Sequence, residues 1–193
     1  MASPIPDEGR ITRERYWQLV EDGVIRPDDR VELLDGVIAT MSPQNPPHAL
    51  VIGALTQQLG RTIGTSCFLR VQLPLDVSDL SVPEPDVAVV PGRPSDYATA
   101  HPTHALLVVE VADRSLPSDR LTKSRIYASG AVDEYWIVNL RDRCIEVYRR
   151  AIPKERRFAD VGIVRPGERL MLVAIPGVAI AVDELLPPPA TSR

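Results

Sequence analysis

Pro85-Asp86-Val87-Ala88-Val89-Val90 is one of two apolar runs that decide the fold of this chain. The other is Ala105-Leu106-Leu107-Val108-Val109-Glu110-Val111-Ala112. Short runs that are apolar on both faces are typical of strands inside a sheet that helices cover. Each run carries one acid, Asp86 at the head of the first and Glu110 near the tail of the second. A carboxylate in such surroundings is costly unless it is paired or binds a metal ion.

Helices and further strands are predicted around these two runs. The spacing of apolar residues predicts helices near 12–22, 48–63 and 119–129. Strands are predicted at 67–77, near 157–164 and 169–173, and in two hairpins, one over 31–39 that turns at Asp35-Gly36 and one over 134–140 and 144–149. The fold class is therefore α/β or α+β, a sheet flanked by helices with an additional β-hairpin region.

Length and composition indicate one soluble globular domain. We expect 193 residues to form a single domain over 1–193, with a core from about 12 to 186 and flexible tails at 1–11 and 187–193. Hydrophobic residues make up 44% and charged residues 25%, and no apolar run reaches the roughly 18 residues that span a bilayer, so we expect no membrane association.

A cytoplasmic location is expected from two further features. The first residues lack the basic and apolar regions of a signal peptide. Cys67 and Cys144 are the two cysteines, and without a secretion signal we expect both to be reduced thiols.

The charge distribution leaves two interpretations open. The net charge of −4 argues against a chain that coats nucleic acid by bulk attraction. Residues 141–157 nevertheless hold seven bases and three acids. Such a segment fits a phosphate-bearing partner, and it equally fits a solvated hairpin with basic side chains.

Asp86 and Glu110 are candidate metal ligands. If their strands are neighbours, both carboxylates can point toward one spot, where two carboxylates, a backbone carbonyl and waters suit Mg²⁺. The ion would polarise a phosphate and lower the pKa of a bound water. The structural alternative for Asp86 is that it accepts hydrogen bonds in a turn. The alternative for Glu110 is an ion pair with Arg70 or Arg125.

Lys123 follows on the helix predicted near 119–129, where it shares a face with Tyr127. If that helix packs back on the two strands, the ammonium can orient a water or stabilise developing charge on a phosphate. A solvated surface lysine is the alternative.

Two further residues have a functional and a structural interpretation. Glu32 is either a third acid of the site or a surface acid beside a turn, and His48 is either a site residue or part of a helix start. Cysteines and histidines lack the spacing of a zinc site, and neither Gly-x-Ser-x-Gly nor Gly-x-x-x-x-Gly-Lys occurs.

Several of these segments together resemble a known nuclease group. The matching residues are Val31–Gly36, Met41–Pro43 with His48, Pro83–Val90, Leu107–Asp113, Lys123 with Tyr127, and Glu134–Val138. They are similar to the PD-(D/E)XK, or restriction-endonuclease-like, nuclease superfamily, and within it to the Uma-type family of restriction endonucleases. The resemblance covers nearly the whole chain.

The resemblance implies a mixed central sheet flanked by helices and metal-dependent cleavage of DNA. Asp86 and Glu110 would hold Mg²⁺ with the backbone of Val111, and Mn²⁺ could substitute. The superfamily pattern places a lysine two residues after the glutamate, and Ala112 occupies that position here. The Uma-like pattern supplies the lysine from the following helix, which nominates Lys123 as the third catalytic residue.

The hypothesis of a Mg²⁺-dependent endonuclease also nominates the residues that surround the catalytic ones. Accessory site residues would be Glu32, His48, Gln72 and Tyr127. Arg120 and Arg125 would contact phosphates of the nucleic acid. A homodimer is an arrangement that the sequence leaves open.

Two other functions remain open at this point. One is a catalytically inactive nuclease fold that binds DNA or a protein partner, which the low overall basicity favours. The other is a structural or dimerisation module that uses the apolar strand at 134–140, with Tyr135 and Trp136. Affinity for DNA that falls with salt would separate these two.

Overall fold

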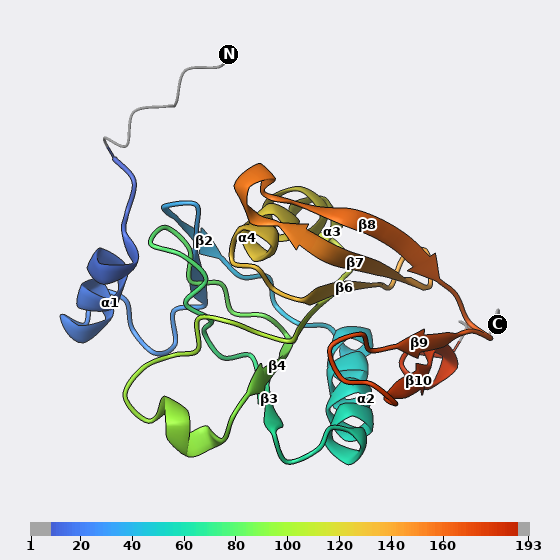
Figure 1. Ribbon diagram of the computed structural model, residues 1–193. Helices are drawn as coiled ribbons and strands as arrows, with labels where there is room; N and C mark the ends of the chain where they lie inside the picture. Colours follow the sequence, from blue (N-terminus) through green and yellow to red (C-terminus); the bar gives the residue numbers. More distant parts are fainter. Residues whose placement is uncertain (1–8, 189–193) are drawn as a thin grey trace.

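The structure is a computed structural model that describes residues 9–188 (Figure 1). Its centre is a six-stranded sheet with the order β3-β4-β5-β6-β7-β8. The strands are β3 (Cys67–Val71), β4 (Val87–Pro91), β5 (Leu107–Ala112), β6 (Glu134–Asn139), β7 (Cys144–Ile152) and β8 (Arg157–Val164). β5 and β6 are parallel and the other neighbours are antiparallel, which confirms the predicted mixed central sheet.

Helices cover this sheet on both faces. α2 (Pro46–Thr62) packs on one face together with a small sheet of β9 (Arg169–Met171) and β10 (Ala179–Ala181), as Figure 1 shows. The opposite face carries the segment 116–129, which we call the site helix. All six residues of β5 and all six of β6 are buried. The interpretation of the apolar runs as strands inside a covered sheet is therefore confirmed.

The site helix is built from three consecutive pieces. They are α3 (Leu116–Ser118), a π-helical turn η2 (Asp119–Lys123) and α4 (Ser124–Ser129). Ile126 and Tyr127 are fully buried against the sheet. Single π-helical turns inside helices are frequent at functional sites, and this one contains Lys123.

A smaller unit lies against the start of β4. β1 (Val31–Leu34) and β2 (Val37–Thr40) form the predicted hairpin, and α1 (Arg13–Glu21) packs on it through Tyr16. Asp35 and Gly36 both have positive φ, as the tight turn at that point requires. This hairpin carries Glu32 toward the central sheet.

Several elements differ from the prediction. The strand expected at 67–77 ends at Val71, because Gln72 has a positive φ and Pro74 has no N–H for a ladder. α2 begins at Pro46 with Asn45 as its cap, so His48 lies in the first turn rather than at the start. β10 was not predicted.

Three short helical turns lie outside the main helices among residues 9–188. Single turns of 3₁₀-helix lie at η1 (Pro94–Tyr97), η3 (Pro153–Glu155) and η4 (Val182–Glu184). The tails expected at 1–11 and 187–193 fall largely outside the described residues. None of the helices formed by residues 9–188 is long and apolar enough to cross a membrane.

Ion pairs neutralise much of the basic segment 141–157. Four of its arginines pair with carboxylates: Arg149 with Glu134, Arg150 with Asp160, Arg156 with Asp35 and Arg157 with Glu155. Their charges are therefore largely compensated within the protein, which favours the hairpin interpretation of this segment over a phosphate-binding face.

Candidate active site

The site lies where β4 and β5 part. Val87 pairs with Val109, so the next opposed pair would be Asp86 and Glu110. The ladder does not continue there. Instead, Oδ2 of Asp86 accepts a hydrogen bond from the backbone N–H of Val111 at 2.8 Å. The side chain of Asp86 thus replaces a backbone partner, and this contact fixes it beside Glu110.

Two side chains hold the other oxygen of Asp86. Gln72 donates its side-chain N–H to Oδ1 at 3.3 Å, and Nε2 of His48 lies 3.0 Å from the same oxygen. His48 reaches this point because Asn45 caps α2 and accepts the N–H of His48 at 3.0 Å. The alternative in which Asp86 only accepts hydrogen bonds in a turn does not describe this geometry.

Glu110 contacts the site helix rather than an arginine. Its Oε1 accepts hydrogen bonds from Nζ of Lys123 at 3.0 Å and from the hydroxyl of Tyr127 at 2.6 Å. Arg70, one of the arginines considered as its partner, bonds to the carbonyl of Pro74 instead. Lys123 and Tyr127 thus approach the same oxygen from one face of the site helix.

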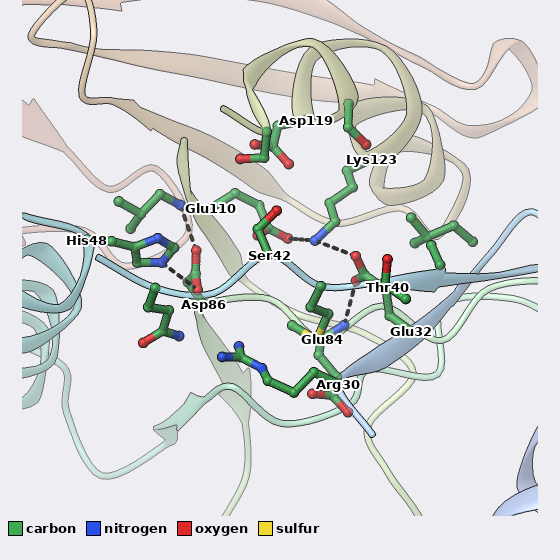
Figure 2. A pocket seen from close by; sticks show the side chains of 17 residues that line it. Arg30, Glu32, Thr40, Ser42, His48, Glu84, Asp86, Glu110, Asp119 and Lys123 are labelled. Carbon is green, nitrogen blue, oxygen red and sulfur yellow. Dashed lines mark hydrogen bonds and ion pairs between the residues drawn. The ribbon is translucent and has the colours of Figure 1, made fainter. Parts of the chain in front are cut away.

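Lys123 joins three parts of the fold. Its Nζ lies 3.0 Å from Glu110 on β5 and 3.1 Å from Oε1 of Glu32 on β1 (Figure 2). Oε2 of Glu32 accepts the backbone N–H of Glu84 at 3.1 Å. Lys123, Glu32 and Glu110 are each at most 7% exposed. Neither the surface-lysine nor the surface-acid alternative therefore holds for Lys123 and Glu32.

A pocket of about 200 Å³ opens beside these groups. Its charged and ionisable lining residues are Arg30, Glu32, His48, Glu84, Asp86, Glu110, Asp119 and Lys123, which Figure 2 labels. A second pocket of about 370 Å³ shares Ser42, Gln44, His48, Val111 and Ser115 with the first and adds Asn45 and Arg114. The acids therefore line a cavity and are not sealed in the packed core.

Comparison with known proteins places the chain in a family. A family model described as a putative restriction endonuclease, Uma2, matches residues 13–183. The chain belongs to the Uma2 family. This membership confirms the resemblance stated above and supports nuclease activity in general terms.

One solved structure has the same fold. It is a putative nuclease belonging to DUF820 from Anabaena variabilis ATCC 29413, with a TM-score of 0.73 and 13% sequence identity. The match covers 91% of this chain and 97% of that one. At this identity the likeness shows a shared fold and not a shared chemistry. No curated protein matches the chain.

Burial changes the acid–base behaviour of the site. Burial raises the pKa of Glu110 well above its ordinary value; Lys123 opposes this shift and Asp86 adds to it. Burial likewise raises the pKa of Glu84, and repulsion from Glu32 adds to that shift. For Lys123 burial acts in the opposite direction, but Glu110 and Glu32 outweigh it and raise its pKa. Lys123 is therefore held as a cation by the carboxylates of Glu110 and Glu32.

The donor set is compatible with Mg²⁺. No three His, Cys, Asp or Glu side chains within residues 9–188 form a ready-made metal site. Mg²⁺ does not require one, because it is commonly held by one or two carboxylates and completes its shell with waters and substrate phosphates. Asp86 and Glu110 meet this need, because their carboxylates lie beside each other at the ends of β4 and β5 and line the same pocket.

The two arginines proposed as phosphate contacts do not line this pocket. Arg120 donates to both carboxylate oxygens of Glu146 on β7, at 3.0–3.1 Å from its Nε. Arg125 is exposed on α4. Their contact with nucleic acid remains a prediction.

Three pocket residues escaped the sequence analysis. They are Arg30, Glu84 and Asp119. Glu84 directly precedes Pro85-Asp86, so its position in the sequence could have predicted that it lies near the site. Arg30 directly precedes β1, and its carbonyl accepts the N–H of Met41 at 2.8 Å. Asp119 begins the π-helical turn. Neither feature has a sequence signature.

Replacing Tyr127 by phenylalanine tests the contact with Glu110. The loss of this buried charge-assisted hydrogen bond should lower the free energy of unfolding by about 1–2 kcal/mol. Urea unfolding measures it. The matched variant is Tyr97→Phe, which removes a hydroxyl bond of 2.9 Å from a half-buried position to the neutral carbonyl of Pro91, and should lose less. Equal losses of unfolding free energy would mean that the hydrogen bond from Tyr127 to Glu110 stabilises the fold no more than the one from Tyr97 to Pro91.

Proposed function

We propose that this chain is a Mg²⁺-dependent endodeoxyribonuclease with a PD-(D/E)XK-like site whose lysine comes from the helix after the second catalytic strand. One observation carries the proposal. Nζ of Lys123 lies 3.0 Å from Oε1 of Glu110, although the two residues belong to different elements. Position 112, where the superfamily has its lysine, is a fully buried alanine. Lys123 supplies from the helix the positive charge that Ala112 lacks.

The residues present define distinct roles. Asp86, Glu110 and the backbone carbonyl of Val111 would hold Mg²⁺, or Mn²⁺ in its place, and the bound ion would polarise the scissile phosphate and lower the pKa of the attacking water. Lys123 already carries its proton and sits between two carboxylates. It therefore orients the water and stabilises negative charge on the phosphate instead of removing a proton. Gln72 and His48 keep the carboxylate of Asp86 in place.

Arg30 is the proposed phosphate contact. Its side chain points into the pocket in Figure 2, and no ion pair holds it among residues 9–188, in contrast to the paired arginines of β7 and β8. A pocket rich in acids repels DNA unless cations compensate the charge. An unpaired guanidinium at its mouth suits a phosphate oxygen.

Arg30→Ala is expected to weaken DNA binding and to reduce the slope of log affinity against log salt by about 1, the change for one lost phosphate contact. Binding is measured in an Asp86→Asn background, so that the DNA is not cut. The control is Arg61→Ala, an exposed arginine in the last turn of α2. A salt slope that equals that of the control would mean that Arg30 does not contact a phosphate of the bound DNA.

The proposed activity is tested by incubating supercoiled plasmid with the protein in Mg²⁺, in Mn²⁺ and in excess chelator. Nicked or linear product with either ion, and none with chelator, is the expected result. Thermal unfolding in the same buffers should show a higher midpoint with Mg²⁺, because an ion bound only by the folded state stabilises it. Cleavage that persists in chelator would contradict the proposal.

A binding module without catalysis is the second candidate. Both oxygens of Asp86 and one oxygen of Glu110 already have partners within the protein, so the network does not depend on a metal ion. This candidate predicts DNA binding that is unchanged by Mg²⁺ and no product under any condition of the plasmid experiment.

A further inference from the structure

Asp119 is a buried acid of the pocket that lacks a full set of partners. Its side chain lies in the π-helical turn, one helical turn before Lys123, and lines the pocket with Asp86 and Glu110 (Figure 2). The residue is 2% exposed, and its Oδ2 has no hydrogen-bond partner among the residues that the structure describes. A buried carboxylate oxygen without a donor is costly, so folds rarely retain one that has no role.

Lys123, Asp86 and His48 are less free to accept a proton than Asp119 is. Lys123 is already protonated, and the two oxygens of Asp86 contact Val111, Gln72 and His48. Nε2 of His48 also lacks a hydrogen bond, but it lies 3.0 Å from Asp86. Oδ2 of Asp119 is the buried carboxylate oxygen that the protein leaves open.

Charges on several elements act on Asp119. Burial raises its pKa to about 6. Lys123 and the side chain of Ser115 oppose this shift, and Asp86 and Glu32 add to it. The ionisable side chains that interact with it are Lys123 on its own helix, Glu32 on β1, Asp86 before β4, Glu110 on β5, Tyr135 on β6 and Tyr148 on β7. Asp119 is thus a buried pocket residue with an unpartnered carboxylate oxygen, which is the placement that general-base catalysis requires.

We propose that Asp119 is the catalytic residue that accepts a proton from the attacking water. The inference rests on the proposed nuclease function. As the water oxygen bonds to phosphorus, one of its protons passes to Oδ2 of Asp119. The bond from phosphorus to the leaving sugar oxygen breaks, and that oxygen keeps the electron pair and takes a proton from solvent. Asp119 then releases its proton to solvent, which restores the carboxylate.

The test compares the parent with Asp119→Asn and Asp119→Glu in single-turnover cleavage of plasmid between pH 5 and pH 9. Asp119→Asn should slow cleavage by about 10²–10⁴-fold, the range for loss of a general base, and should remove the rise of the rate with pH through the acidic limb. Asp119→Glu should recover part of the rate. Asp22→Asn, at an exposed helix end, is the matched control and should cleave as the parent does.

A structural role for Asp119 predicts a different set of results. If Asp119 is instead catalytic, the Asp119→Asn variant in chelator should unfold at the same or a higher temperature than the parent above pH 7. An acid with a raised folded-state pKa destabilises the fold as pH rises through that pKa, and asparagine removes this cost. A less stable variant with parent rates would overturn the inference. Full recovery of the rate by more Mg²⁺ would also overturn it, because Asp119 would then be a metal ligand.

The proposed function and this inference can fail separately. If the parent cleaves and Asp119→Asn cleaves equally well with the same pH profile, only the inference fails. If the parent does not cleave at all, both fail.

Discussion

Asp86→Asn is expected to reduce Mg²⁺-dependent cleavage by more than about 100-fold, because even residues that merely support a metal ligand contribute 10–100-fold. Asparagine keeps the shape of the side chain, and its Oδ1 can still accept the N–H of Val111, which aspartate accepts at 2.8 Å. It lacks the negative charge that holds a hard cation. The variant should therefore fold as the parent does while losing both Mg²⁺ binding and cleavage.

Three measurements separate these effects. Single-turnover cleavage gives the rate, and the thermal midpoint with and without Mg²⁺ gives the binding of the ion. Circular dichroism checks the fold. Asp28→Asn, in an exposed turn, is the control. If Asp86→Asn cuts at the parent rate, Asp86 does not hold the catalytic ion.

Lys123→Met should have the largest combined effect. It removes the cation that lies 3.0 Å from Glu110 and 3.1 Å from Glu32, and so leaves two buried acids without their shared partner. Breaking a buried ion pair from one side typically costs about 3–5 kcal/mol of stability. Cleavage should fall by about 10²–10³-fold, the loss seen when one electrostatic stabiliser of a transition state is removed.

The stability loss of Lys123→Met should depend on pH. The folded-state pKa of Glu110 is already raised above its ordinary value with Lys123 present, and it rises further without the lysine. An acid with a raised pKa stabilises the fold at low pH, and this contribution is lost as pH rises through the folded-state value. The deficit should therefore be greater at pH 8 than at pH 5.

Denaturant unfolding at both pH values measures this deficit. Lys154→Met is the matched control, because Lys154 is the other lysine of the chain and is exposed on η3. Its effect should stay within about 0.5 kcal/mol, as for most surface substitutions. Equal deficits for the two variants, or a Lys123→Met deficit independent of pH, would mean that the buried ion pairs contribute little.

The sequence revealed the main acids because of their surroundings. Asp86 and Glu110 stand in apolar runs that can only be buried strands, and such positions rarely hold a carboxylate without a reason. The helical spacing of Lys123 and Tyr127 predicted one shared face, and both indeed approach the same oxygen of Glu110. Local sequence patterns were sufficient to predict the site residues that lie on the regular strands and on one face of the site helix.

Other parts of the site depend on contacts that no local pattern encodes. Asp119 and Lys123 are the first and last residues of a π-helical turn in the site helix, and such a turn has no recognisable sequence pattern. Arg156 pairs with Asp35, which is remote in sequence, so the apparent basicity of its segment was misleading. Arg120 was proposed as a phosphate contact but is held by Glu146, a partner that the β6–β7 hairpin brings beneath the helix.

Packing explains the position of Lys123. Ala112 and Glu110 point to the same face of β5, and Ala112 is completely buried in the cluster that packs the site helix on the sheet. A long cationic side chain would overfill that position. The helix that covers Ala112 supplies Lys123 instead.

The most direct test of this account compares plasmid cleavage in Mg²⁺ by the parent, Lys123→Ala and Lys154→Ala, prepared identically. The account predicts product from the parent and from Lys154→Ala, blocked by chelator, and at least about 100-fold less from Lys123→Ala. Equal cleavage by all three proteins would contradict it, because the lysine of the site helix would then have no part in the reaction.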